Sequence, residues 1–166
     1  MTAAQRSGGD FVDHVRREWT ATFPEVDLSP MEILARINRI ASKTNHLLDA
    51  ALSPVGVSRA EFDVLSALRR AGRALRASEV TSVTLMSGAS TTKITERLVR
   101  EGLVERLRFE RDARVVLLQL TDSGTELVNR VFPTRLEKDR ELLTGLDAQE
   151  LDTLAALLRK VALNVG

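Results

Sequence analysis

Cysteine and tyrosine are absent from this 166-residue sequence, and histidine occurs only as His14 and His46. The absence of cysteine excludes disulfides, thiol redox sensing and cysteine-ligated metals. The two histidines lie far apart in the sequence, so no metal site is expected. No segment approaches the ~20 apolar residues of a transmembrane helix, and no apolar run follows the N-terminal residues as a signal peptide requires. We therefore expect a cytoplasmic protein without a metal and without a membrane partner.

An excess of charge of one sign is also missing, because the sequence has 24 Lys and Arg residues and 23 Asp and Glu residues. A net charge of +1 excludes a general polyanion binder. The charges are unevenly distributed, however: residues 58–124 hold twelve basic and nine acidic side chains. A basic middle with acidic flanks is a modest footprint for phosphate binding.

Catalytic signatures are missing as well. The sequence has no recognisable nucleophile–base–acid set, no Gly-rich phosphate loop, and no HExxH or GxSxG motif. Its carboxylates lie at helix-capping and ion-pairing positions. We therefore predict that the protein is not an enzyme and needs no cofactor.

Apolar spacing predicts two helices in the N-terminal third. Phe11, Val15 and Trp19 are four residues apart, which places them on one face of a short helix. Ser29 and Glu32 around Pro30 are typical of a capping box. A long amphipathic helix is therefore expected from residue 29 to about residue 52.

In the rest of the chain, the sequence predicts three helices, then a β-hairpin, and then two more helices. A second capping box, Ser58 with Glu61, begins a helix that extends to Gly72. Helices are expected across residues 77–83 and 87–101, then from residue 121 or 122, and finally after Asp147. The β-prone runs LVERLRF and RVVLLQL are separated by the charged ERDA, which favours a hairpin.

A helix followed by a basic two-stranded ribbon is the pattern of a winged helix-turn-helix, which places its helix in the major groove of DNA. The predicted fold is therefore mainly α with a small β-hairpin. Residues 58–124 form the winged DNA-binding domain. Residues 1–57 and 125–166 form a helical dimerisation region, because their apolar stripes need a cover and a symmetric dimer supplies one.

The helix of residues 87–101 carries hydroxyl and basic side chains on the face opposite Ile94 and Leu98. Hydroxyls can donate to phosphates, while Lys and Arg can read guanine O6 and N7. The predicted DNA contacts on this helix are Ser87, Ser90, Thr92, Lys93 and Arg97. The alternative is a solvated face held by Glu96–Arg100 and Arg97–Glu101 pairs.

Arginines of the hairpin complete the predicted DNA surface. A narrow minor groove attracts an inserted arginine, and we predict this role for Arg114 and Arg111. Asp112 can instead pair with one of these arginines and shape the turn, and the two roles are compatible.

The segment from Leu75 to Gly124 resembles the MarR family of bacterial regulators. The resemblance rests on Ser78-Glu79-Val80, Ser87-x-x-Ser90-x-Thr92, Arg97-Leu98, Gly102-Leu103-Val104-Glu105-Arg106, Asp112-x-Arg114 and Leu120-Thr121-x-x-Gly124. It implies a homodimer with interleaved terminal helices that binds a palindromic operator and represses transcription. Ala113 departs from the arginine that is frequent at its position.

The N-terminal helix with Trp19 is similar to a branch of that family whose members respond to urate and phenolic compounds. The resemblance implies an effector site at Trp19, Asp63 and Arg106. The remaining arginine of that branch's urate site falls at Ile94, which is apolar, so the ligand is left open. On physical grounds, Trp19 can supply a flat wall, and Arg36, Arg39, His46 or Arg106 a counter-charge for an anion. Each of these residues can also be purely structural.

The function predicted from the sequence is a DNA-binding transcriptional regulator that acts as a homodimeric repressor. Its partners are double-stranded DNA, a second copy of the chain and a small, aromatic or anionic effector that releases the operator. The alternative is a winged helix used only for protein contacts.

Overall fold

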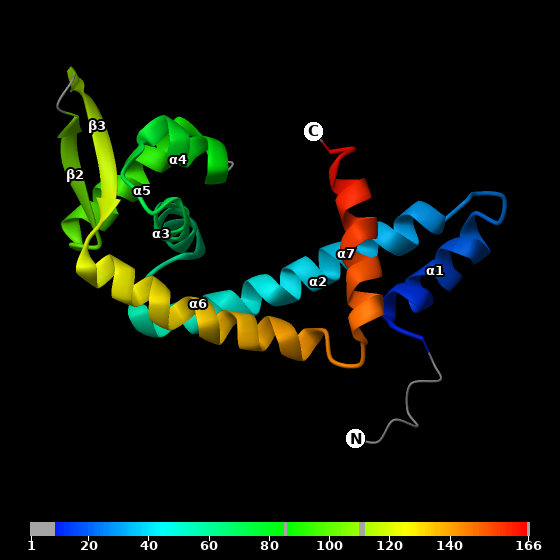
Figure 1. Ribbon diagram of the computed structural model, residues 1–166. Helices are drawn as coiled ribbons and strands as arrows, with labels where there is room; N and C mark the ends of the chain where they lie inside the picture. Colours follow the sequence, from blue (N-terminus) through cyan, green and yellow to red (C-terminus); the bar gives the residue numbers. More distant parts are fainter. Residues whose placement is uncertain (1–8, 85, 110–111, 166) are drawn as a thin grey trace. The chain divides into compact units, whose positions relative to one another are not determined.

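The structure is a computed structural model that describes residues 9–84, 86–109 and 112–165; the side chains of residues 109 and 112–115 lie outside this description. Residues 1–50 and 51–166 form two separate units. The first contains α1 (Phe11–Thr22) and all but the end of α2 (Ser29–Leu52). The second carries every other element (Figure 1).

The helix predicted around Phe11, Val15 and Trp19 is confirmed as α1. It begins with a capping box that the sequence reading missed: the Asp10 carboxylate accepts from the N–H of Asp13 at 3.0 Å, and the Asp13 carboxylate accepts from the N–H of Asp10 at 2.7 Å. At the other end of the helix, the Trp19 ring stacks on Phe23 with centroids 5.6 Å apart.

The capping box predicted at Ser29 and Glu32 is wrong. The Ser29 hydroxyl donates to the carboxylate of Asp27 at 2.9 Å, and the N–H of Glu32 donates to the carbonyl of Leu28 at 3.1 Å. Because Asp27 precedes the helix, its two oxygens receive both the hydroxyl and the N–H of Ser29. The Glu32 carboxylate is therefore free to approach Arg16 and Arg36.

In the second unit, the short helix η2 (Ser53–Val55) and Gly56 join α2 to α3 (Arg59–Ala71). The predicted capping box of α3 is confirmed, with the Ser58 hydroxyl and backbone N–H both donating to Glu61 at 2.8 Å. Next come α4 (Ala77–Thr84) and α5 (Gly88–Arg100). The core of this unit includes the fully buried side chains Phe62, Leu65, Val80 and Leu98.

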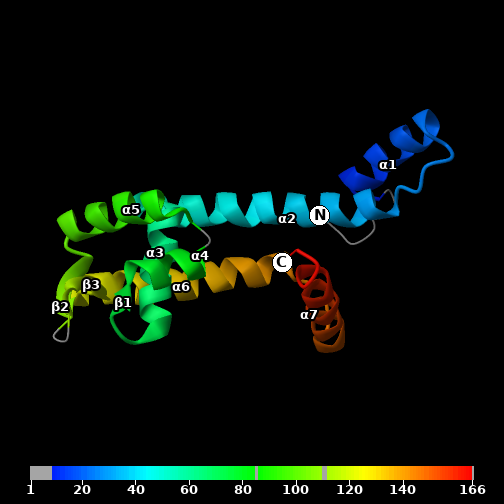
Figure 2. The same ribbon diagram turned by 90° about the horizontal axis from the view of Figure 1, so that it is seen from above.

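The predicted hairpin is confirmed as β2 (Val104–Phe109) and β3 (Asp112–Leu120), but the sheet has three strands. The third strand, β1 (Leu75–Arg76), pairs antiparallel with β3 through Leu75 and Leu118. Figure 2 shows the sheet beside α3, α4 and α5, and the contacts of β3 with α3, β2 with α5 and β1 with α4 hold them together. The sheet therefore fixes α5 relative to the hairpin.

Two helices complete the second unit: α6 (Asp122–Leu142) and α7 (Ala148–Ala162). The Thr121 hydroxyl caps α6 by accepting from the N–H of Gly124 at 3.1 Å, and Asp147 with Glu150 forms the predicted capping box of α7. The apolar stripe of α7 is exposed in the single chain, with Leu154, Leu157 and Leu158 at 38%, 54% and 42%.

Candidate nucleic-acid interface

Helix α5 is anchored to the second unit along one face. Thr91, Thr95 and Leu98 are buried, at 1%, 3% and 0% exposed. The hydroxyl of Thr81 in α4 donates to the hydroxyl of Thr91 at 3.0 Å, which links the two helices of the helix-turn-helix. The opposite face of α5 therefore has to point outward.

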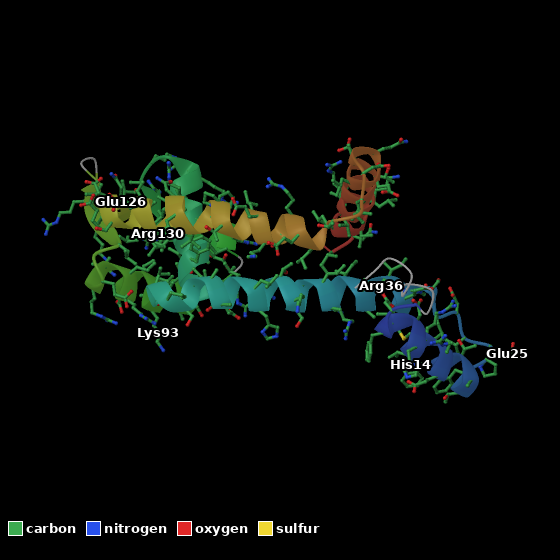
Figure 3. The ribbon with its side chains drawn as sticks, turned by 90° about the horizontal axis from the view of Figure 1, so that it is seen from below. His14, Glu25, Arg36, Lys93, Glu126 and Arg130 are labelled. Atoms are coloured by element: carbon green, nitrogen blue, oxygen red, sulfur yellow. The ribbon has the colours of Figure 1, made fainter. Side chains whose placement is uncertain are left out.

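The outward face carries the hydroxyls and the lysine that the sequence predicts to contact DNA. Ser87 caps the helix, accepting from the N–H of Ser90 at 3.2 Å and donating to the Ser90 hydroxyl at 2.9 Å. The Thr92 hydroxyl donates to the carbonyl of Gly88 at 3.0 Å. Lys93 is exposed, points away from the ribbon (Figure 3), and forms no ion pair with any described residue. These four side chains lie within the seven residues from Ser87 to Lys93.

Arg97 is placed differently from the other predicted contacts. Its Nε donates to Glu101 at 2.8 Å and lies 3.1 Å from a carboxylate oxygen of Glu61, while Nη2 donates to the carbonyl of Gly56 at 3.2 Å. Glu61 is 3% exposed in its side chain, whereas Arg97 is 45% exposed. The hydrogen bond to Glu101 and the charge of Glu61 raise the pKa of Arg97 above its usual value. The guanidinium therefore contacts three groups of the protein itself: the carboxylates of Glu101 and Glu61 and the carbonyl of Gly56.

The predicted wing contacts fall partly outside the described residues. Arg111 lies outside them altogether, and Arg114 belongs to β3 with a side chain that is not described. Both stay predictions. Arg108 lies at the end of β2 and is exposed.

The predicted effector residues are divided between the two units. Trp19 and Arg36 belong to the first, and Asp63 and Arg106 to the second. Asp63 is exposed on α3, and Arg106 is 4.0 Å from the carboxylate of Glu96. All four stay predictions.

Arg36 is surrounded by carboxylates. Its guanidinium lies 2.9 Å from Asp10, 2.6 Å from Asp13 and 3.2 Å from Glu32, so it ties the start of α1 to α2. Three anions already compensate its charge, which favours a structural role over binding of an anionic effector.

Replacing Arg36 with glutamine should raise the pKa of Asp13. In the native chain the N–H of Asp10, followed by the Arg36 guanidinium, holds this pKa below its usual value of 3.8. A lowered pKa means that the contact stabilises the fold above pH 3.8, and that this contribution is lost as the pH falls through the lowered value. Titration of the carboxyl carbons by NMR measures the change.

Asp27 is the control in the same spectra. Its pKa is also lowered, but by the backbone N–H and hydroxyl of Ser29 and without Arg36. It should therefore titrate identically in both proteins. Equal movement of Asp13 and Asp27, or movement of neither, would contradict the assigned cause.

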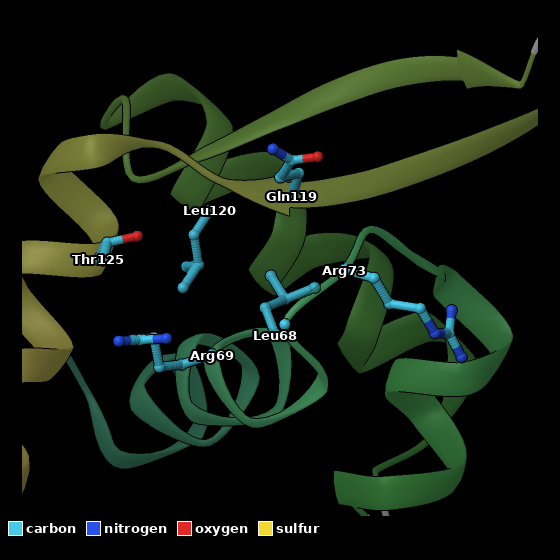
Figure 4. A pocket seen from close by; sticks show the side chains of 7 residues that line it. Leu68, Arg69, Arg73, Gln119, Leu120 and Thr125 are labelled. Atoms are coloured by element: carbon cyan, nitrogen blue, oxygen red, sulfur yellow. The ribbon is translucent and has the colours of Figure 1, made fainter.

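Two hollows in the second unit lie away from the predicted effector residues. One of about 210 Å³ is lined by Arg69 of α3, by Arg73 in the segment between α3 and β1, by the end of β3 and by Thr125 of α6 (Figure 4). The other, of about 380 Å³, lies between Ser66 of α3 and Phe132 of α6. None of the four predicted effector residues lines either hollow.

Comparison with known proteins places this geometry in a family. Residues 55–115 match the model of the MarR family. Over 152 residues the chain is 32% identical to the transcriptional regulator PecS of Dickeya dadantii. The matched segment covers 90% of this chain and 92% of PecS. The chain belongs to the MarR family. It is thus a DNA-binding transcriptional regulator rather than an enzyme, as the sequence predicts.

Solved structures of MarR-family proteins share the fold. A cysteine-to-serine mutant of MarR from Escherichia coli, solved in complex with operator DNA, is 32% identical and has a TM-score of 0.67, with 82% of this chain and 99% of that chain covered. BpsR of Bordetella bronchiseptica, whose DNA binding is regulated by 6-hydroxynicotinic acid, is 26% identical with a TM-score of 0.68. The match covers 79% of this chain and 98% of BpsR. The winged-helix fold predicted from the sequence is therefore confirmed.

Two features of this MarR-family chain escaped the sequence reading. Strand β1 has only two residues, which is too short for an alternating pattern to be visible. The approach of Arg97 to Glu61 joins residues 36 positions apart, and such a contact has no local signature.

In the described part of the chain, no helix is long and apolar enough to span a membrane.

Proposed function

We propose that this MarR-family regulator is a homodimeric repressor that binds a palindromic operator and releases it when a small ligand binds. The observation that carries the proposal is the outward face of α5, where hydroxyls and a lysine without an ion pair to any described residue lie on a helix whose other face is buried. A dimer would present two such helices about one turn of DNA apart, ~34–36 Å.

In this proposal Ser87, Ser90, Thr92 and Lys93 contact the operator from the major groove. Hydroxyls donate to phosphates or base edges, and the lysine contacts phosphate or guanine. Arg111 and Arg114 of the wing insert beside the adjacent minor groove. The operator complex of the related E. coli protein supports this placement of the winged helix.

The proposed effector is a small aromatic or anionic molecule. Regulation of the related BpsR by 6-hydroxynicotinic acid supports an effector of this class. We retain Trp19, Asp63 and Arg106 as the proposed contacts, while the three carboxylates around Arg36 favour leaving it out. A ligand that prefers a dimer with displaced recognition helices weakens DNA binding through its differential affinity alone.

Selection from a random pool of duplexes tests the proposal directly. The full chain should enrich a palindromic sequence, and footprinting should show two protected half-sites. A chain that enriches no sequence, and whose weak binding to duplex does not change with salt concentration, would instead be a protein-interaction module.

Lys93→Gln should weaken binding to the enriched duplex about tenfold and make the negative slope of log K against log salt shallower by about one, because one phosphate contact is lost. Titrations at several salt concentrations measure both quantities. The matched control is Arg159→Gln, which removes one exposed positive charge from α7 and should leave the slope unchanged. Equal slopes for both variants would mean that Lys93 does not contact a phosphate of the DNA.

A further inference from the structure

Arg97 occupies the junction of three segments of the second unit. It belongs to the last turn of α5, and its guanidinium reaches Glu61 in the first turn of α3 and the carbonyl of Gly56 in the segment that precedes α3. Gly56 has a φ of 69°, in the left-handed region that glycine adopts readily. The arginine thus connects the recognition helix to the point where the second unit begins.

Glu61 has two functions in this arrangement. One carboxylate oxygen accepts the backbone N–H and the hydroxyl of Ser58, which begins α3, while the other lies 3.1 Å from Arg97. With a side chain that is 3% exposed, this carboxylate has almost no access to water. A buried carboxylate depends on its partners for stabilisation, so its position and that of Arg97 are mutually determined.

We propose that Arg97 is a positioning residue, which orients α5 for DNA by bridging to Glu61 and Gly56, and not one of the residues that read the operator. The proposal rests on the proposed function, since it concerns how the same interface is held. It separates α5 into two parts: the first turns, with Ser90, Thr92 and Lys93, contact DNA, and the last turn fixes the helix to α3. It replaces the direct contact that the sequence predicts for Arg97.

Four variants of the full chain test the proposal: Arg97→Gln, Glu61→Gln, the double variant and Glu101→Gln. Glutamine at position 61 can still accept the Ser58 N–H, so the start of α3 is preserved. Arg97→Gln and Glu61→Gln should each lower the affinity for the enriched duplex about tenfold, and the double variant should be no weaker than the weaker single one, because both remove one interaction. Glu101→Gln should change it less than about twofold, since this partner is more exposed.

The salt dependence distinguishes positioning from contact. Arg97→Gln should keep the wild-type slope of log K against log salt, whereas loss of a phosphate contact makes this negative slope shallower by about one. The proposal is overturned if Glu61→Gln binds DNA as the wild type does, or if the effects of the two single variants simply add.

A measurement without DNA keeps this test independent of the proposed function. Hydrogen exchange of the free protein should show faster exchange in the last turn of α5 in Glu61→Gln but not in Glu101→Gln. Unchanged exchange in Glu61→Gln would overturn the bridge even if the chain binds its operator. Conversely, faster exchange in a chain that enriches no DNA sequence would support the bridge and contradict only the proposed function.

Discussion

Replacing Leu158 with aspartate is expected to leave a monomer whose affinity for operator DNA is at least about a hundredfold lower. Leu154, Leu157 and Leu158 form the exposed apolar stripe of α7, which a second copy of the chain would cover in the proposed dimer. A charge within a buried apolar interface is costly because it loses its hydration. A monomer also loses the gain from engaging two linked half-sites, which is on the order of 10²–10⁴.

Sedimentation measures the oligomeric state of this variant, and titration of the enriched duplex measures its affinity. The control is Gln149→Asp, which adds the same charge to an exposed position of α7 on the side away from the stripe and should remain dimeric. If Leu158→Asp sediments and binds DNA as the wild type does, α7 does not form the dimer interface.

The local features of the fold could be predicted from the sequence because their causes are local. The boxes at Ser58 and Asp147, the glycine after α3 and the β-prone runs each act within a few residues, and each predicted element is present. The error at Ser29 has the same origin. Ser29 and Asp27 compete to cap one helix end, and the pattern from Ser29 to Glu32 alone does not reveal which side chain accepts.

The site was predictable in part. Periodicity identifies the buried face of α5, so Ser90, Thr92 and Lys93 follow as its outward residues. Arg97 also lies outside the buried stripe, and the sequence therefore groups it with Lys93. Only the fold brings Glu61 and Gly56 to its guanidinium, since those residues precede it by 36 and 41 positions.

Gly124→Ala is expected to destabilise the protein by about 2–3 kcal/mol, a large share of the ~5–15 kcal/mol typical of a folded domain. Gly124 lies buried in the first turn of α6, where a Cβ atom would collide with the backbone carbonyl oxygen of Leu103 and lie 3.1 Å from a methyl group of Leu120. That carbonyl also accepts the N–H of Thr121 at 3.2 Å. Since the obstacle is hydrogen-bonded backbone, relieving the collision requires α6 to move away from the segment between α5 and β2.

Urea unfolding measures this loss, and Gly88→Ala provides a matched control. A Cβ at Gly88 meets nothing within 4 Å, and this glycine lies in the first turn of α5. Alanine there should leave the stability unchanged or raise it by up to about 1 kcal/mol, because alanine favours helix. A Gly124→Ala protein that unfolds at the wild-type urea concentration would contradict the close approach. The expected contrast gives the glycine of the Leu120-Thr121-x-x-Gly124 pattern a physical reason: it lets α6 begin directly against the chain that connects the recognition helix to the wing.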